Sequence, residues 1–191
     1  MARRSDKRER LLDAAAEAFW VDGFAATSLA DIAERSGVPV GNIYYYFKTK
    51  AAIAEGVADI FIESSLQSLN DIDRTNHTPT EKLRAFISLL KESAEPRAKR
   101  GCPLANAIRD FSPSVPVAAE TTNSVFTTLI GWISQTLNKS GDRNAVRHAR
   151  IAIARWQGAI VLAQGTGEAK ILIEALNELE ADLLLWAKAS K

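Results

Sequence analysis

The sequence has one cysteine and two histidines in 191 residues, and this scarcity excludes several kinds of site. Cys102 alone cannot form an internal disulfide or the usual multi-cysteine zinc site, although a disulfide between subunits remains open. His77 and His148 lie far apart in the sequence, and no phosphate-binding loop or metal-spaced cluster accompanies them. We therefore expect no metal, no cofactor and no enzymatic activity.

Long apolar runs are also absent. None approaches the roughly 20 residues needed to cross a bilayer. The first six residues lack the apolar stretch of a signal peptide. A cytoplasmic location is the expectation.

Charge gives little direction, because the net charge is only +1. The first ten residues are locally basic, with Arg3, Arg4, Lys7, Arg8 and Arg10 against Asp6 and Glu9. Composition alone does not point to nucleic acid. The function must be read from the arrangement of residues.

Strand signals are scarce, so the sequence predicts an all-α fold. We expect about nine helices. Their predicted ranges are 6–23, 28–36, 40–47, 51–69, 78–94, 103–111, 117–137, 144–164 and 168–189. Between them lie a polar break at 70–77 and a basic linker after residue 94. Two domains are predicted, a three-helix segment with helix-turn-helix spacing over 1–50 and a helical bundle over 51–191.

Local signals mark several helix ends. Ser28 and Thr78 are each followed three residues later by an acid, the pattern of a capping box. Proline at position 79 strengthens the second start, because proline is favoured at the first helical position. Gly37 is expected to end the second helix and begin the turn.

Three consecutive tyrosines, the only ones in the chain, lie on the short third helix. At about 100° per residue they cannot all face one core. We expect Ile43 and Phe47 to point inward, with Tyr45 and Tyr46 turned outward. Tyrosine suits contact with phosphate and with thymine methyl groups.

The start of this helix has the properties of an element that reads the major groove. Gly41 permits close approach, and Asn42 can hydrogen-bond a base edge. Lys48 and Lys50 can neutralise phosphates just beyond the helix. Thr27 and Ser28 offer hydroxyl groups to the flanking phosphate.

Together these residues resemble the DNA-binding signature of the TetR family over about the first 55 residues. The matching positions are Phe19, Gly23, Phe24, Thr27, Ile32, Ala33, Gly37, Val38, Gly41, Ile43, Tyr44, Phe47 and Lys50. The resemblance implies DNA contacts from Thr27, Gly41, Tyr44, Tyr45, Tyr46 and Lys50. The sequence departs from the family at Pro39-Val40, where serine and a basic residue are common, and at Tyr46, where histidine is frequent. The predicted DNA contacts are Thr27, Ser28, Val40, Gly41, Asn42, Tyr44, Tyr45, Tyr46, Lys48 and Lys50.

The resemblance also implies that the rest of the chain forms a bundle with an effector pocket, and that the last two helices pair with their twofold mates. Two apolar seams fit that pairing, although the same spacing fits an ordinary internal core. The seams are Val146, Ala149, Ile153, Trp156, Ile160 and Ala163, and Leu172, Leu176, Leu179, Leu183 and Trp186. The predicted function is a repressor that binds double-stranded palindromic operator DNA as a homodimer and is released by a small, mostly apolar effector.

Large apolar side chains are the candidates for the effector pocket. They are Phe86, Leu90, Leu104, Ile108, Phe111, Phe126, Leu129, Ile133 and Trp156. Two alternatives stay open. One is an architectural DNA-binding protein of this fold without an effector, and the other is a thiol-based sensor of electrophiles or oxidants through Cys102, whose basic neighbours would favour the thiolate.

Overall fold

The computed structural model describes residues 2–188, with side chains from Lys7 onward. This part of the chain contains helices and no strand, so the all-α prediction is confirmed. The helices are α1 (Ala2–Asp22), α2 (Leu29–Ser36), α3 (Val40–Tyr46), α4 (Lys50–Thr75), α5 (Pro79–Glu92), α6 (Ala94–Arg100), α7 (Pro103–Phe111), α8 (Pro116–Lys139), α9 (Ala145–Thr166) and α10 (Ala169–Trp186). None of the described helices is long and apolar enough to span a membrane.

The helices pack into two compact units. The first comprises Met1–Glu63 and Pro103–Ser124, and the second comprises Ser64–Cys102 and Val125–Lys191. The prediction that residues 1–50 and 51–191 are the functional domains stays a prediction. Packing groups the chain differently, because α7 lies against α1.

The core of the first unit surrounds an aromatic cluster. Phe19, Phe24 and Phe111 meet edge to face, with ring centroids 5.1 to 5.9 Å apart. Aromatic pairs favour this arrangement because the positive edge of one ring meets the negative face of the next. Ile32 of α2 and Ile43 of α3 are fully buried in the same core. This core fixes α3 relative to α1 and α2.

Several helix ends have the predicted local causes. The Ser28 hydroxyl accepts from the Asp31 amide, and the Asp31 carboxylate accepts from the Ser28 amide. Thr78 and Glu81 form the same reciprocal pair at the start of α5. Gly37 ends α2 with φ of 66°, a left-handed conformation that glycine adopts without steric cost.

The predicted non-helical segments are partly wrong. α4 continues to Thr75, because Leu69 and Ile72 are both buried and lie one helical turn apart. The predicted basic linker contains α6, whose Ala94 and Ala98 are buried at i and i+4. Both helices are stabilised by tertiary burial that their polar sequence conceals.

The first helix also begins earlier than predicted, at Ala2 rather than near Asp6. The side chains of Arg3, Arg4 and Asp6, named above for their charge, lie outside the described side chains. At the other end, α10 stops at Trp186, and residue 189, the predicted last helical residue, lies outside the described part.

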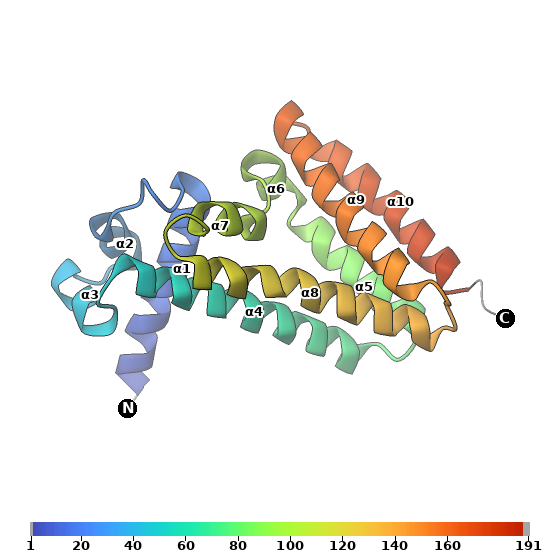
Figure 1. Ribbon diagram of the computed structural model, residues 1–191, viewed down its shortest axis with the longest axis horizontal. Coiled ribbons are helices and arrows are strands. Elements are labelled where there is room, and N and C mark those ends of the chain that lie inside the picture. The colour runs from blue at the N-terminus through green and yellow to red at the C-terminus, as the bar shows by residue number, and fades with distance from the viewer. Residues whose placement is uncertain (1, 189–191) are drawn as a thin grey trace. The chain divides into compact units, whose positions relative to one another are not determined.

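In the second unit, α9 and α10 lie side by side along their length (Figure 1). His148 near the start of α9 stacks on Trp186 at the end of α10, so the two helices are antiparallel. α5 and α6 also pack on this pair. The buried side chains of this bundle are mostly aliphatic, with Phe86 of α5 and Trp156 of α9 buried among them.

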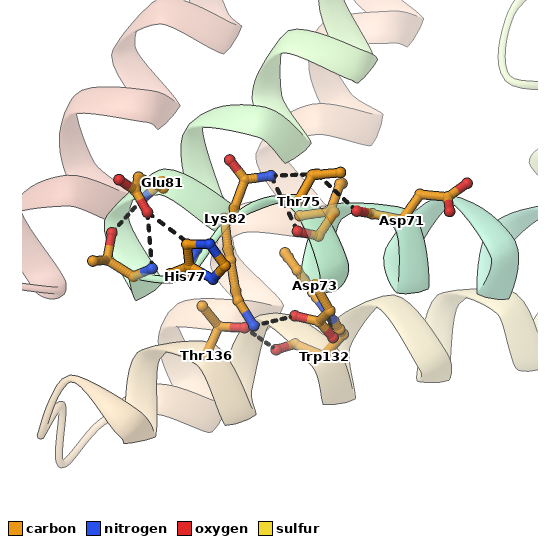
Figure 2. Close-up of polar contacts among 11 residues, drawn as sticks. Asp71, Asp73, Thr75, His77, Glu81, Lys82, Trp132 and Thr136 are labelled. Atoms are coloured by element: carbon orange, nitrogen blue, oxygen red, sulfur yellow. Dashed lines mark hydrogen bonds and ion pairs between the residues drawn. The ribbon is translucent and has the colours of Figure 1, made fainter.

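A polar cluster joins α4, α5 and α8 within this unit (Figure 2). The Asp73 carboxylate accepts from Lys82 Nζ at 2.5 Å and from Trp132 Nε1 at 3.1 Å. Partial burial raises the pKa of Asp73, but the hydrogen bonds from Lys82 and Trp132 outweigh it and hold the pKa below its ordinary value. The charged form therefore stabilises the fold.

The substitution Asp73→Asn is expected to lower the free energy of unfolding by about 1 kcal/mol at pH 7, because the carboxylate is partly solvent-screened. The pKa of Asp73 is lowered on folding, so its contribution is complete above about pH 4 and is lost as the pH falls through the folded-state pKa. Urea unfolding of both proteins at pH 7, 5 and 3.5 measures this.

The matched control is Asp71→Asn, since Asp71 pairs only with neighbours on α4 and is half exposed. Its effect should stay within about 0.5 kcal/mol at pH 7. Equal destabilisation by both variants, or a difference between Asp73→Asn and wild type that does not change with pH, would contradict the role of the Asp73 charge.

Candidate nucleic-acid interface

Helix α3 follows the turn at Gly37 and is held by its buried side. Ile43 is fully buried and Phe47, the residue that ends the helix, is 5% exposed. The Phe47 amide donates to the Ile43 carbonyl at 2.8 Å, which closes the last turn. The opposite side of α3 is therefore presented to solvent in a fixed orientation.

The three tyrosines divide differently from the prediction. Tyr44 and Tyr45 are 51% and 56% exposed, whereas Tyr46 is half buried and packs against the core of the first unit. The rings of Tyr45 and Tyr46 meet edge to face, 5.1 Å between centroids. The outward orientation predicted for Tyr46 is thus wrong, because Tyr46 lies one turn from the buried Ile43.

The N-terminal end of α3 is open. Val40, Gly41 and Asn42 are all exposed. A Cβ added at Gly41 would meet nothing within 4 Å, so the fold itself does not require glycine there. A small residue at this end allows close approach of another molecule to the backbone.

The two hydroxyl residues before α2 have different roles. Ser28 is exposed, and its capping box orients the start of α2. Thr27 is only 2% exposed, and its hydroxyl donates to the Gly23 carbonyl at 2.8 Å, with the Ala18 carbonyl at 3.3 Å. The prediction of a free hydroxyl at Thr27 is corrected. This side chain satisfies carbonyl groups at the end of α1.

The two lysines after α3 also differ. Lys48 is exposed and its Nζ lies 3.0 Å from the Tyr44 carbonyl. Lys50 is half buried, with Nζ 3.2 Å from the Ala25 carbonyl and 4.5 Å from the centre of the Phe24 ring. Burial lowers the pKa of Lys50, and nearby Asp31 opposes that shift. Lys48 is the freer cation for a phosphate.

The predicted effector residues fall into both packing units. Leu104, Ile108 and Phe111 belong to the first unit, whereas Phe86, Leu90, Phe126, Leu129, Ile133 and Trp156 belong to the second. The cavity beside Phe111 measures only about 10 Å³. Phe111 is fully buried in the aromatic cluster, so we reassign it from the effector site to the core of the first unit.

Cys102 is buried, with 3% of its surface exposed. Arg97 Nη1 lies 3.7 Å from the Cys102 Sγ. Reaction with an electrophile requires access as well as a favourable charge environment. The burial of Cys102 does not favour the thiol-sensor alternative.

The two apolar seams are used inside the chain. Ala149, Ile153, Trp156, Ile160 and Ala163 of α9 are all buried, as are Leu172, Leu176, Leu179 and Leu183 of α10. The internal-core interpretation is therefore correct for these side chains. Val146 is the exception in α9, at 53% exposed, and Trp186 is half buried.

The exposed surface of α9 and α10 also carries apolar side chains. Val161, Leu162 and Leu185 are 67%, 61% and 62% exposed. Gly158 and Gly165 are exposed on α9, and a Cβ at either would meet nothing within 4 Å. The two predicted seams did not include these positions, because they followed the spacing of the residues that turn out to be buried.

Sequence reasoning also missed a contact at the start of α9. The His148 ring stacks on the Trp186 ring with centroids 4.1 Å apart, and His148 Nδ1 lies 2.6 Å from Asp142 Oδ2. Asp142 is buried and also accepts from the Asn144 amide. The pairing with Trp186 joins residues 38 positions apart, so no local pattern could have indicated it.

Comparison with known families agrees with this arrangement over most of the chain. Residues 11–57 match the family described as bacterial regulatory proteins, tetR family. Residues 79–178 match the family described as transcriptional regulator LmrA/YxaF-like, C-terminal domain. The first match includes α2 and α3, and the second runs from the start of α5 into α10.

Individual proteins show the same similarity. An uncharacterised HTH-type transcriptional regulator of Lactococcus lactis is 23% identical over 86% of this chain and 87% of its own. The HTH-type transcriptional regulator LmrA of Bacillus subtilis is 33% identical, over 44% of this chain and 46% of its own. The HTH-type transcriptional repressor KstR2 of Mycolicibacterium smegmatis is 32% identical, over 49% of this chain and 45% of its own length. The last two matches span less than half of those relatives.

Solved structures share the fold. A TetR transcriptional regulator from Chloroflexus aurantiacus superimposes with a TM-score of 0.81 at 25% identity, covering 96% of this chain and 97% of that one. A TetR transcriptional regulator from Legionella pneumophila gives 0.80 at 21% identity, covering 91% and 95%. The chain therefore belongs to the TetR family of transcriptional regulators, which are DNA-binding helix-turn-helix proteins and not enzymes.

Proposed function

We propose that the protein is a repressor that binds a palindromic operator as a homodimer and is released by a small-molecule effector. The observation that carries the proposal is the exposed face of α3. Gly41, Asn42, Tyr44 and Tyr45 are exposed there, while Ile43 and Phe47 hold the helix from behind. An exposed helix supported in this way is the form in which helix-turn-helix proteins read the major groove.

The proposed contacts have distinct roles. Asn42 reads a base edge, where its amide can make two hydrogen bonds to adenine. Val40, Gly41, Tyr44 and Tyr45 lie against the groove wall and thymine methyl groups. Ser28 and Lys48 contact phosphates. Tyr46 and Lys50 are half buried and contribute less to DNA contact. Thr27 does not contact DNA, and its hydroxyl stabilises the loop before α2 by donating to the Gly23 carbonyl.

Dimerisation follows from the geometry of the DNA. A palindrome has two half-sites related by twofold symmetry, which two copies of one chain match. The exposed apolar face of α9 and α10, containing Gly158, Val161, Leu162 and Leu185, is the proposed contact between the copies. Its glycines would allow two helices to approach closely.

Selection of binding sites from a random pool of DNA duplexes tests the proposal with the full chain. The enriched sequences should contain two inverted half-sites centred about 10 base pairs, or a multiple of that, apart. Enrichment of a single unrepeated site, or no enrichment, would contradict the dimeric operator.

Lys48→Ala is expected to weaken binding to the selected DNA several-fold for all sequences alike, because a phosphate contact carries no sequence information. The slope of log affinity against log salt should become shallower by about 1. Fluorescence anisotropy between 50 and 300 mM salt, about a sixfold range, measures both quantities.

The control is Lys139→Ala, which removes an exposed lysine at the end of α8. Its affinity and salt slope should equal those of wild type. If Lys48→Ala left the slope unchanged, Lys48 would not be a phosphate contact.

Release by an effector is tested separately by adding aromatic and lipophilic compounds to the complex with DNA. A fall in anisotropy with any of them supports the effector-responsive repressor. If no compound released the DNA, the architectural, effector-free alternative would be favoured.

A further inference from the structure

Arg97 of α6 lies over a buried tryptophan of α9 in the second unit. The guanidinium carbon is 5.3 Å from the centre of the Trp156 ring, and Trp156 is 3% exposed. Arg97 Nε donates to Ser93 Oγ at 2.8 Å and Nη1 to Cys102 Sγ at 3.7 Å. These contacts fix the guanidinium and leave Nη2 without a hydrogen bond among the described residues.

No described carboxylate forms an ion pair with Arg97. Burial lowers the pKa of Arg97, and the adjacent Cys102 only partly opposes that shift. A guanidinium stays charged even so, and a partly buried charge is unfavourable unless an anion or strong acceptors compensate it. Among the described residues, the Trp156 ring and Cys102 lie against the Arg97 charge and no carboxylate pairs with it.

Two donors on α9, one of them on the tryptophan under Arg97, lack acceptors. Trp156 Nε1 and Gln157 Nε2 are both buried, and neither donates a hydrogen bond to any described residue. Proteins rarely leave buried donors unpaired, because the group has lost its hydrogen bonds to water without replacement. An indole N–H can only donate, so the missing partner must be an acceptor.

We propose that Arg97 and Trp156 anchor the carboxylate of an organic acid, which is the effector of the proposed repressor. One oxygen accepts from Trp156 Nε1 and the other from Arg97 Nη2, with Gln157 Nε2 as a further donor. The inference rests on the proposed function and replaces a mostly apolar effector with an acid.

The test measures binding directly, in the absence of DNA, with acids and their uncharged amides. Phenylacetate with phenylacetamide, and hexanoate with hexanamide, differ only in the group that the anchor would recognise. Isothermal titration of wild-type protein should show each acid binding at least about tenfold more tightly than its amide.

Substitutions test whether Arg97 and Trp156 cause the preference for acids. Arg97→Gln should reduce acid affinity at least about tenfold and leave amide affinity within about twofold. Trp156→Phe, which keeps an aromatic ring but removes the N–H, should also weaken the acids. Lys99→Gln is the matched control, because Lys99 is an exposed cation on the same helix and should leave both affinities unchanged.

Equal binding of acids and amides to wild type would overturn the proposal, as would absence of acid binding up to about 5 mM, a Kd corresponding to negligible affinity. Equal losses in Arg97→Gln and Lys99→Gln would also overturn it. The wild-type comparison decides the matter even if a variant fails to fold. If a water molecule is the only acceptor for Trp156 Nε1, the wild-type protein should bind the acids no more tightly than their amides, which would also overturn the proposal.

Failure of this inference is distinguishable from failure of the proposed function. Acids that bind at Arg97 but do not release DNA would leave the anchor standing and remove the effector response. If neutral compounds released the DNA while acids did not bind, the proposed repressor function would stand and the Arg97 anchor would be wrong.

Discussion

Gly41→Glu is expected to lower the affinity for the selected operator DNA by at least about 100-fold while leaving the fold intact. The side chain has room in the free protein, since a Cβ at Gly41 would meet nothing within 4 Å. A carboxylate at the start of a helix is favourable for the helix itself. In the complex, however, it would stand against the phosphates and fill the gap that close approach requires.

Fluorescence anisotropy gives the affinity, and circular dichroism with thermal unfolding verifies the fold. Gly131→Glu is the control for the added charge and for replacing a helical glycine, because a Cβ at Gly131, inside α8, would also meet nothing within 4 Å. It should bind DNA as wild type does. If Gly41→Glu retained wild-type affinity, α3 would not be the helix that enters the groove.

Val161→Glu is expected to convert the protein into a monomer and to reduce operator affinity by about 100-fold or more. Val161 is 67% exposed on α9, so the substitution costs the isolated chain little. A charge buried between two copies is strongly unfavourable, because it loses its water without gaining a partner. Loss of the dimer removes the gain from engaging two half-sites at once.

Light scattering after size exclusion distinguishes a 20.8 kDa chain from twice that mass. Val117→Glu is the matched control, because Val117 of α8 is a comparably exposed valine at 62%. That variant should remain dimeric and bind DNA normally. A dimeric Val161→Glu would mean that the copies meet elsewhere.

Local interactions explain how much of the fold could be predicted. The capping boxes at Ser28 and Thr78 and the left-handed Gly37 each involve residues within a few positions of one another. The TetR resemblance depended on such local features, and the family assignment confirmed it. The end of α4 and the whole of α6 were missed, since they depend on burial against other helices.

The candidate site was predictable in its location and less so in its details. The sequence indicated α3, but the direction of each tyrosine depends on where Ile43 meets the core. The inward position of Thr27 and the engagement of Lys50 with Ala25 arise from how α1 ends and α4 begins. The encounter of Arg97 with Trp156 joins residues 59 positions apart and leaves no local trace.

The exposed glycines of α9 have a consequence for evolution of the chain. Glycine in the interior of a solvent-exposed helix costs about 1 kcal/mol relative to alanine. Gly158, inside α9, would therefore be an easy site for stabilising change if selection maintained only the folded monomer. Under the proposed assembly, a larger residue at Gly158 would stabilise each chain and push the two copies apart, so selection for regulation would oppose selection for stability at this position.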